Sequence, residues 1–154
     1  QSHLGLARSL TAQSDVRSIL YDTQKDLFIA GAELACSSEA LPKLKKRIEK
    51  EDTAKLESWI DDCTGRCGLP GDFLIPGNTA DSAAVHVARA TCRRCERLVV
   101  MLNRENGQYE ALIGYLNRLS DLLFVLAWSL EFYAAVDETV RRLNSERGGE
   151  SRRI

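Results

Sequence analysis

Arginine, histidine and glutamate side chains recur on one side of a helix that we expect between residues 79 and 104. They share this stripe with one serine, and the set is Ser82, His86, Arg89, Arg93, Glu96 and Arg97. At about 100° per residue, these positions fall within one stripe along the helix. Guanidinium groups match phosphate and carboxylate oxygens in pairs, so the stripe indicates an anion site. The pattern alone also fits a solvated face or an ion-pair network between helices.

The start of this helix is marked by Pro76 and Gly77, which end whatever element precedes them. Asn78 or Thr79 can cap the helix, because a short side-chain oxygen accepts from first-turn amides. The free amides of that turn would add to an anion site. Opposite the stripe we expect a buried apolar face, made of Ala84, Val87, Ala88, Cys92, Cys95, Val99 and Leu102.

A second group of polar side chains lies inside the long apolar run near the C-terminus. Asn117, Asp121, Phe124 and Trp128 are spaced by four, three and four residues, so they share one helix face. A buried amide or carboxylate is costly unless it is paired. One interpretation is that Asp121 neutralises an arginine of the helix at 79–104. The other is that Asn117 and Asp121 line a ligand cleft, and both can hold together.

The elements that must position these groups are helical, because no strand-like alternation occurs along the chain. Apolar periodicity predicts five helices, at residues 1–12, 15–35, 51–65, 79–104 and 108–144. Residues 36–46 read as a loop. Short loops between long amphipathic helices favour one antiparallel bundle over residues 1–154, with a frayed tail at 145–154. The last helix is apolar over most of its circumference, which indicates a central position or an oligomer interface.

Composition excludes several classes of protein. The net charge of -1 across 154 residues gives no sign of a general nucleic-acid or membrane-surface binder. No apolar run reads as long enough to span a bilayer, and no signal peptide is visible. Five cysteines, an odd count, favour reduced thiols over a disulfide framework. A zinc site from Cys63, Cys67, Cys92 and Cys95 is the alternative to buried core thiols, and we predict no resident metal.

Several stretches together resemble one family, the PduO-type ATP:cob(I)alamin adenosyltransferases. The matching texts are FLIPGNT, VHVAR, RRCER and YLNRLSDLLFVLAW, with DLFIAGAELA and LESWIDD upstream. The resemblance covers most of residues 2–128. It implies a five-helix bundle of the ferritin-like adenosyltransferase type, assembled as a homotrimer with active sites between subunits. It also implies transfer of the 5′-deoxyadenosyl group of ATP to the cobalt of cob(I)alamin, with magnesium offsetting the phosphate charge and triphosphate released.

The resemblance assigns roles by matching position. The implied ATP-binding residues are Arg89, Arg93, Glu96, Arg97, Asn117 and Arg118. Those implied to act in catalysis are Arg93, Arg97 and Asp121, the last by pairing with an arginine. The implied cobalamin-binding residues are Phe73, His86 and Phe124. Phe73 matches the aromatic at the lower axial face of cobalt, and we favour a hydrogen-bonding role for His86 over a cobalt ligand.

The chain departs from the family pattern at three places. Asn78 and Thr79 stand for a glycine and a serine, and Trp128 stands for an arginine. The family's glycine- and threonine-rich phosphate loop is not matched, because Gln1 aligns just after it. We expect that loop either to precede Gln1 in a longer chain or to be lost. A non-catalytic corrinoid-binding or delivery bundle is therefore the alternative function, and a helical interaction protein is a third.

The resemblance also implies partners. It implies that ATP and a reduced corrinoid are the substrates, that a flavin reductase supplies the reduced cobalt, and that an adenosylcobalamin-dependent enzyme receives the product. Neither nucleic acid nor a membrane is expected. Reduced thiols and the missing signal favour the cytoplasm, with the mitochondrial matrix as the alternative compartment.

Overall fold

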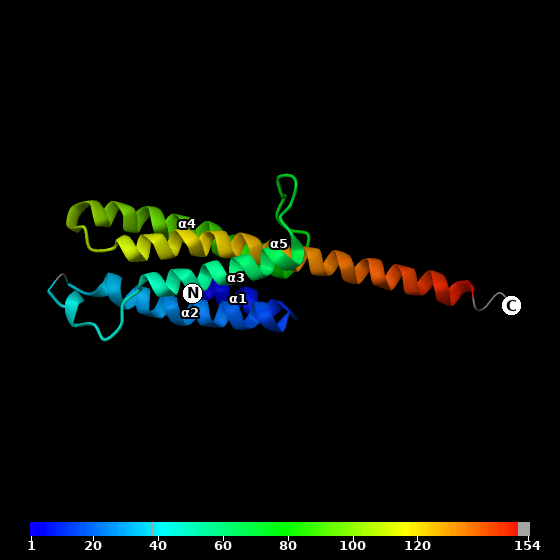
Figure 1. The fold of residues 1–154 in the computed structure, drawn as a ribbon, viewed down its shortest axis with the longest axis horizontal. Coiled ribbons are helices and arrows are strands. Elements are labelled where there is room, and N and C mark those ends of the chain that lie inside the picture. The colour runs from blue at the N-terminus through cyan, green and yellow to red at the C-terminus, as the bar shows by residue number, and fades with distance from the viewer. Residues whose placement is uncertain (38, 151–154) are drawn as a thin grey trace.

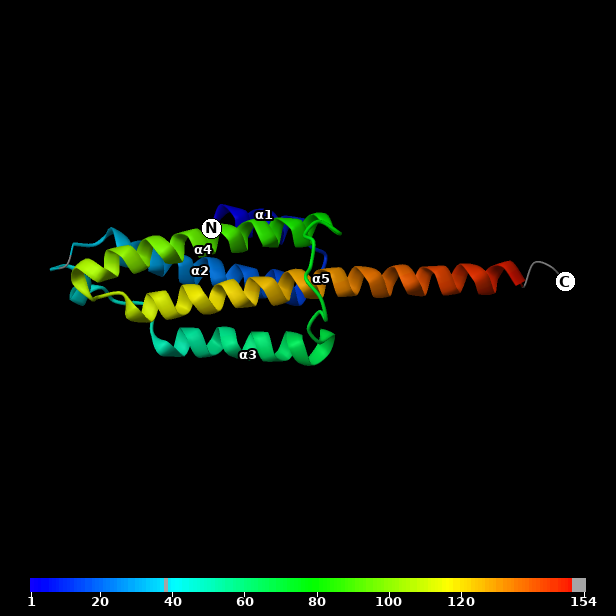
Figure 2. The same ribbon diagram turned by 90° about the horizontal axis from the view of Figure 1, so that it is seen from above.

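The computed structural model describes residues 1–37 and 39–150, and this part of the chain is helical without a strand. The helices are α1 (Ser2–Leu10), α2 (Ser14–Ala35), α3 (Lys50–Cys67), α4 (Ala80–Asn106) and α5 (Glu110–Glu150). Successive helices run in opposite directions along one long axis (Figures 1 and 2). The predicted all-α, five-helix antiparallel bundle is confirmed.

Most helix bounds lie within two residues of the prediction, and two features depart further. The segment read as a loop at 36–46 contains a short 3₁₀ helix, Leu41–Lys43. The last helix does not end near residue 144 but continues to Glu150, so residues 145–150 of the predicted tail are helical. Residues 151–154 of that tail lie outside the described part. The C-terminal portion of α5 extends well beyond the end of the bundle (Figure 1).

Helix α5 forms the centre of the bundle, with α3 on one side and α4 on the other (Figure 2). Its inward side chains are almost fully buried: Leu112, Tyr115, Leu116, Leu119, Leu122, Leu123 and Leu126. Contrary to the sequence expectation, a window of α5 is long and apolar enough to cross a membrane by length and composition. Because 56% of that window is buried inside the bundle, core packing accounts for its apolar character.

The end of the bundle away from the 68–79 loop is tied together by Glu33. This carboxylate is 1% exposed and accepts hydrogen bonds from Arg47 Nε at 2.7 Å and from the Ile48 amide at 2.9 Å. Arg47 Nη2 also donates to the carbonyl of Gln108 at 2.9 Å, beside the turn between α4 and α5. The connection from α2 to α3 is thereby joined to the connection from α4 to α5.

Helix α4 begins where a cap was expected. Thr79 is the cap residue, and its Oγ1 accepts from the Ser82 amide at 3.2 Å. The helix closes at Gly107, whose φ of 64° is the left-handed conformation that glycine adopts without a Cβ clash. Of the two predicted caps, Thr79 is confirmed and Asn78 has a different role, described below.

The buried face of α4 is rotated from the prediction. Ala84, Ala88, Cys92 and Val99 are buried as expected, whereas Val87 is 51% exposed. Leu102 is also exposed, so both were wrongly placed in the core, and the buried Val85 was missed. The cause is that α4 packs against both α1 and α5, which moves the buried arc toward α5.

The cysteines behave as core side chains. All five are free thiols, and burial raises the pKa of the Cys92 thiol to about 12, so it stays protonated. Its Sγ donates to the Leu116 carbonyl at 3.3 Å. Among the described residues, no group of three or more His, Cys, Asp or Glu side chains could hold a metal ion. The four-cysteine zinc alternative therefore has no support.

Candidate active site on the α4 and α5 flank

Glu96 links the two helices that carry the predicted ATP-binding residues. Its carboxylate accepts from Arg93 Nη1 at 2.5 Å on its own helix and from Asn117 Nδ2 at 3.0 Å on α5. Glu96 is 8% exposed, while the Arg93 side chain is 42% exposed. The carboxylate thus fixes one edge of the guanidinium and one amide hydrogen, and the rest of the Arg93 fork faces outward. These three residues form the Arg93–Glu96–Asn117 group.

The stripe on α4 is not a solvated face along its whole length. Ser82, His86 and Glu96 are buried against neighbouring elements, and Arg89 is half-buried. Arg97 is exposed and makes no hydrogen bond or ion pair within residues 1–37 and 39–150. It lies at the edge of the stripe, about 40° from Arg93 around the helix axis, where no helix of this protomer covers it.

Asp121 does not pair with an arginine of α4, so that interpretation is wrong. Its Oδ2 accepts from Arg118 Nη1 at 3.1 Å within α5 itself, and the residue is exposed. A carboxylate three residues after an arginine reaches it along the same helix, which requires no contact between helices. Asp121 therefore pairs with an arginine, but not with one in the Arg93–Glu96–Asn117 group.

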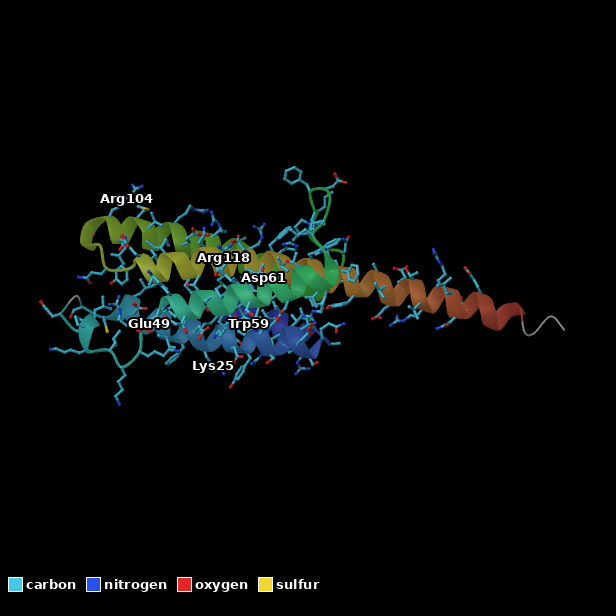
Figure 3. All side chains as sticks on the ribbon, viewed as in Figure 1. Lys25, Glu49, Trp59, Asp61, Arg104 and Arg118 are labelled. Atoms are coloured by element: carbon cyan, nitrogen blue, oxygen red, sulfur yellow. The ribbon has the colours of Figure 1, made fainter. Side chains whose placement is uncertain are left out.

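Arg118 is directed toward α3 and away from the Arg93–Glu96–Asn117 group. Its Nε lies 3.1 Å from Glu57 Oε1 on α3, and Figure 3 labels it where α5 runs beside that helix. Consecutive residues are about 100° apart around a helix, so Asn117 and Arg118 cannot face the same neighbour. Of these two predicted ATP-binding residues, Asn117 contacts Glu96 and Arg118 lies outside the Arg93–Glu96–Asn117 group.

A cleft lies between the start of α4, the middle of α5 and the loop of residues 68–79. Its volume is about 600 Å³, and its wall brings together Phe73, His86 and Phe124, the three residues predicted to bind cobalamin. Arg89 also lines it. The loop projects from the side of the bundle (Figure 1). Phe73 is fully exposed on this loop, which leaves its ring free to cover a ligand in the cleft.

Phe124 is the centre of the cleft wall on α5. The His86 ring meets it edge to face, with centroids 6.5 Å apart and planes at 64°. The Arg89 guanidinium carbon lies 5.9 Å from the same ring centroid, within the range of a cation–π contact. Arg89, predicted on the ATP side, lines this cleft. It precedes Arg93 by one turn, about 6 Å along the axis, so the cleft and the Arg93–Glu96–Asn117 group adjoin.

The polar atoms of the cleft wall are not satisfied by the protein. Both ring nitrogens of His86 and the Nε of Arg89 are buried and lack a hydrogen-bond partner among the described residues. Burial lowers the pKa of His86, the neighbouring Arg89 charge lowers it further, and Glu131 opposes the shift. The imidazole is therefore neutral at neutral pH, with one donor and one acceptor available to a ligand.

We expect the stability of the protein to fall below pH 6.5 because of His86. Its folded-state pKa is lower than its unfolded value of 6.5, so the unfolded chain binds the proton first as the pH falls. The free energy of unfolding should therefore decrease as the pH falls through 6.5. Urea unfolding of wild type and His86→Gln measures this. An equally steep decrease in the variant would show that His86 is not the responsible group.

Glu131 is a residue of this region that sequence reasoning missed. It is 6% exposed and accepts from Ser82 Oγ at 2.7 Å and from Asn78 Nδ2 at 2.9 Å. Trp128, one turn earlier on α5, donates from Nε1 to the Gly68 carbonyl at 3.1 Å. The available signal was a single acidic residue inside the apolar run AWSLEFY. Such a carboxylate needs a partner, but the sequence does not say which.

Comparison with known proteins identifies the family. The family model described as cobalamin adenosyltransferase matches residues 1–130. The corrinoid adenosyltransferase of Citrobacter freundii is 41% identical over 126 residues, which cover 82% of this chain and 72% of that protein. The cobalamin adenosyltransferase of Cupriavidus metallidurans is 38% identical over 127 residues, 82% of this chain and 66% of that one.

The fold matches a solved structure of the same kind. A phenylalanine-to-alanine variant of the PduO-type ATP:corrinoid adenosyltransferase from Lactobacillus reuteri, complexed with cobalamin and ATP, superposes with a TM-score of 0.77. It is 31% identical, and the match covers 85% of this chain and 74% of that chain. The family match extends over most of the chain and includes both helices of the candidate site. This protein belongs to the cobalamin adenosyltransferase family.

Proposed function

We propose that this protein transfers the 5′-deoxyadenosyl group of ATP to the cobalt of a reduced corrinoid, releasing triphosphate. The observation that carries the proposal is the adjacency of two unlike sites on one flank. The Arg93–Glu96–Asn117 group offers a guanidinium fork suited to polyphosphate, and the neighbouring cleft offers aromatic rings suited to a corrin. The family relatives are named for this reaction.

The protein need not supply a nucleophile for this reaction. The electron pair of cob(I)alamin attacks C5′ of ATP, the cobalt–carbon bond forms, and the bond from C5′ to the triphosphate oxygen breaks. Negative charge grows on the leaving triphosphate. Arg93 would stabilise that charge with the guanidinium hydrogens that Glu96 leaves free, and Asn117 would keep the Glu96 carboxylate in place. The main contribution of the protein is positioning the two substrates.

The corrinoid side would exclude water and a lower axial ligand. Phe73 lines the cleft with its ring fully exposed, and Phe124 forms the opposite wall. An apolar ring below the metal keeps a fifth ligand away, so the electron-rich state needed for attack is reached more easily. We assign His86 a hydrogen bond to the bound ligand rather than a bond to cobalt, since its neutral ring offers both a donor and an acceptor.

Magnesium would enter with ATP as its counter-ion. The carboxylates of this flank are already engaged: Glu96 with Arg93, Asp121 with Arg118, and Glu131 with Ser82 and Asn78. The ion would therefore be held chiefly by phosphate oxygens and water, as is common for magnesium at nucleotide sites.

We further propose that three copies assemble around the exposed side of α4. Val87, Leu98 and Met101 are 51%, 61% and 62% exposed, and they fall within about 60° of one another around the helix. Such a row of apolar side chains on an uncovered helix face fits an interface between copies. Arg97 lies at the border between this row and the polar stripe, so a neighbouring copy would place it beside the bound polyphosphate.

The remaining assignments follow from the reaction. A reductase, such as a flavin enzyme, must supply the cob(I) state, and an adenosylcobalamin-dependent enzyme would use the product. The five free thiols favour a reducing compartment such as the cytoplasm.

The test is the formation of the cobalt–carbon bond. We expect the full-length protein, given ATP, magnesium and chemically reduced cobalamin under anoxic conditions, to form adenosylcobalamin and one triphosphate per turnover. The product is recognised by its absorption spectrum and its cleavage by light. Tight binding of cobalamin without either product would instead support a corrinoid-delivery bundle. If neither cobalamin nor ATP bound, the charged groups of the site would be only a structural ion-pair network.

A further inference from the structure

Both ends of the 68–79 loop are hydrogen-bonded to α5, and its middle is not. This loop joins α3 to α4 and carries Phe73 to the cleft. Residues 69–77 make no hydrogen bond within the described part of the chain. Their exposed apolar members are Leu69, Phe73 and Ile75, at 59%, 105% and 85%. The place of the loop tip is therefore set by how its two ends are held.

The first anchor is Trp128. Its indole Nε1 donates to the Gly68 carbonyl at 3.1 Å, at the point where the chain leaves α3. Gly68 itself has a φ of 64°, a left-handed turn that directs the chain away from the helix. The indole ring also lies beside Phe132, with centroids 6.5 Å apart and planes at 53°, but the contact with the loop is the hydrogen bond. The direction in which the loop departs is thus fixed by a side chain of α5.

The second anchor is Glu131, one turn further along α5. One carboxylate oxygen accepts from Asn78 Nδ2 at 2.9 Å, and the other accepts from Ser82 Oγ at 2.7 Å. Because Glu131 is only 6% exposed, its carboxylate oxygens depend on these two donors in place of water. A single buried side chain therefore bonds both the end of the loop and the first turn of α4, and it fixes their positions relative to each other.

We propose that Trp128 and Glu131 are positioning residues for the corrinoid side of the reaction. They hold the two ends of the loop against one face of α5, and this sets where Phe73 stands relative to Phe124 across the cleft. The inference rests on the proposed function. Trp128 and Asn78, which take part in the two anchors, stand where the family pattern noted above has arginine and glycine. Trp128 and Glu131 lie about three and about four turns from Asn117, so neither contacts the residues proposed to bind ATP.

The first test is the kinetic effect of Trp128→Phe, which keeps an aromatic ring and removes the donor. One hydrogen bond is worth between about a twofold and a tenfold change in an equilibrium. We expect kcat/KM for the corrinoid to fall by that factor with KM for ATP unchanged. Phe132→Leu is the matched control, because it disturbs the same contact between rings and removes no hydrogen bond to the loop. An equal loss in both variants would overturn the anchor role.

A double-mutant cycle separates positioning from general support. If Trp128 acts by placing Phe73, then Trp128→Phe should have little further effect in a Phe73→Ala background. Fully additive losses would show that Trp128 acts on something other than the Phe73 ring, and would contradict the proposal.

Limited proteolysis tests the two anchors without measuring activity, so its result does not depend on whether the proposed function is correct. Chymotrypsin cleaves after large apolar residues, and Phe73 is exposed on the loop. We expect Trp128→Phe and Asn78→Ala each to speed cleavage within residues 69–77, as followed by mass spectrometry, and Phe132→Leu to leave it unchanged. An inactive wild type with this cleavage pattern would reject the proposed function alone. Equal cleavage rates in all four proteins would reject the anchors.

Discussion

Replacement of Arg93 by alanine is expected to lower kcat for adenosyl transfer by about 100-fold or more. The Arg93 guanidinium donates one hydrogen bond to Glu96, and its remaining hydrogens are directed outward. They would stabilise the negative charge that develops on the leaving triphosphate. Steady-state kinetics with saturating ATP measures the effect. The fold should survive, because the Arg93 side chain is 42% exposed and its ion pair contributes little to stability.

Two further variants sharpen this result. Arg93→Lys keeps the charge and loses the fork, so an intermediate rate is expected. Arg17→Ala is the matched control, since this arginine is exposed on α2, which contributes nothing to the site. Arg97→Ala should also abolish turnover if a neighbouring copy completes the site around it. Full activity in Arg93→Ala, with an unchanged oligomer, would show that the polyphosphate binds elsewhere.

Replacement of Phe73 by alanine is expected to slow cobalt–carbon bond formation by about tenfold or more while leaving KM for ATP unchanged. The ring is fully exposed and lines the cleft, so its loss removes an apolar cover from the corrinoid side and nothing from the core. Water or another axial ligand could then reach the cobalt, and a barrier higher by about 1.4 kcal/mol gives a tenfold slower rate. Single-turnover absorption spectroscopy separates this step from ATP binding.

Ile75→Ala is the control for the Phe73 variant. Ile75 is 85% exposed on the same loop but does not line the cleft. It should leave the rate near that of wild type, and Phe73→Leu should keep more activity than Phe73→Ala. If Ile75→Ala and Phe73→Ala slowed the reaction equally, the loop as a whole would matter and the ring would have no specific role.

The fold could be predicted because its signals are local. Apolar residues at three- and four-residue spacing gave the five helices, and Thr79 and Gly107 carry the side chain and the conformation that start and end α4. The bundle followed from short connections. The rotation of the buried face of α4 could not be predicted, because Val85 and Val87 are the same residue type and only the packing of the helices buries one and leaves the other exposed.

The candidate site was predictable in its members but not in all of its pairings. Spacing placed Arg93 and Glu96 on one face of α4 and Asn117 on one face of α5. The resemblance put all three at one site, and the structure brings them together. The sequence offered Asp121 to an arginine of α4 or to a ligand cleft, whereas the structure pairs it with Arg118 on its own helix. The contacts of Glu131 with Asn78 and Ser82 join residues far apart in the chain, so only the folded arrangement shows them.

The most direct measurement of the central claim is a crystal structure of the full-length protein with ATP and a corrinoid. We expect triphosphate oxygens within hydrogen-bond distance of the Arg93 guanidinium, and the corrin seated in the cleft between the Phe73 and Phe124 rings. Triphosphate bound away from α4, or a corrin that leaves this cleft empty, would contradict the account.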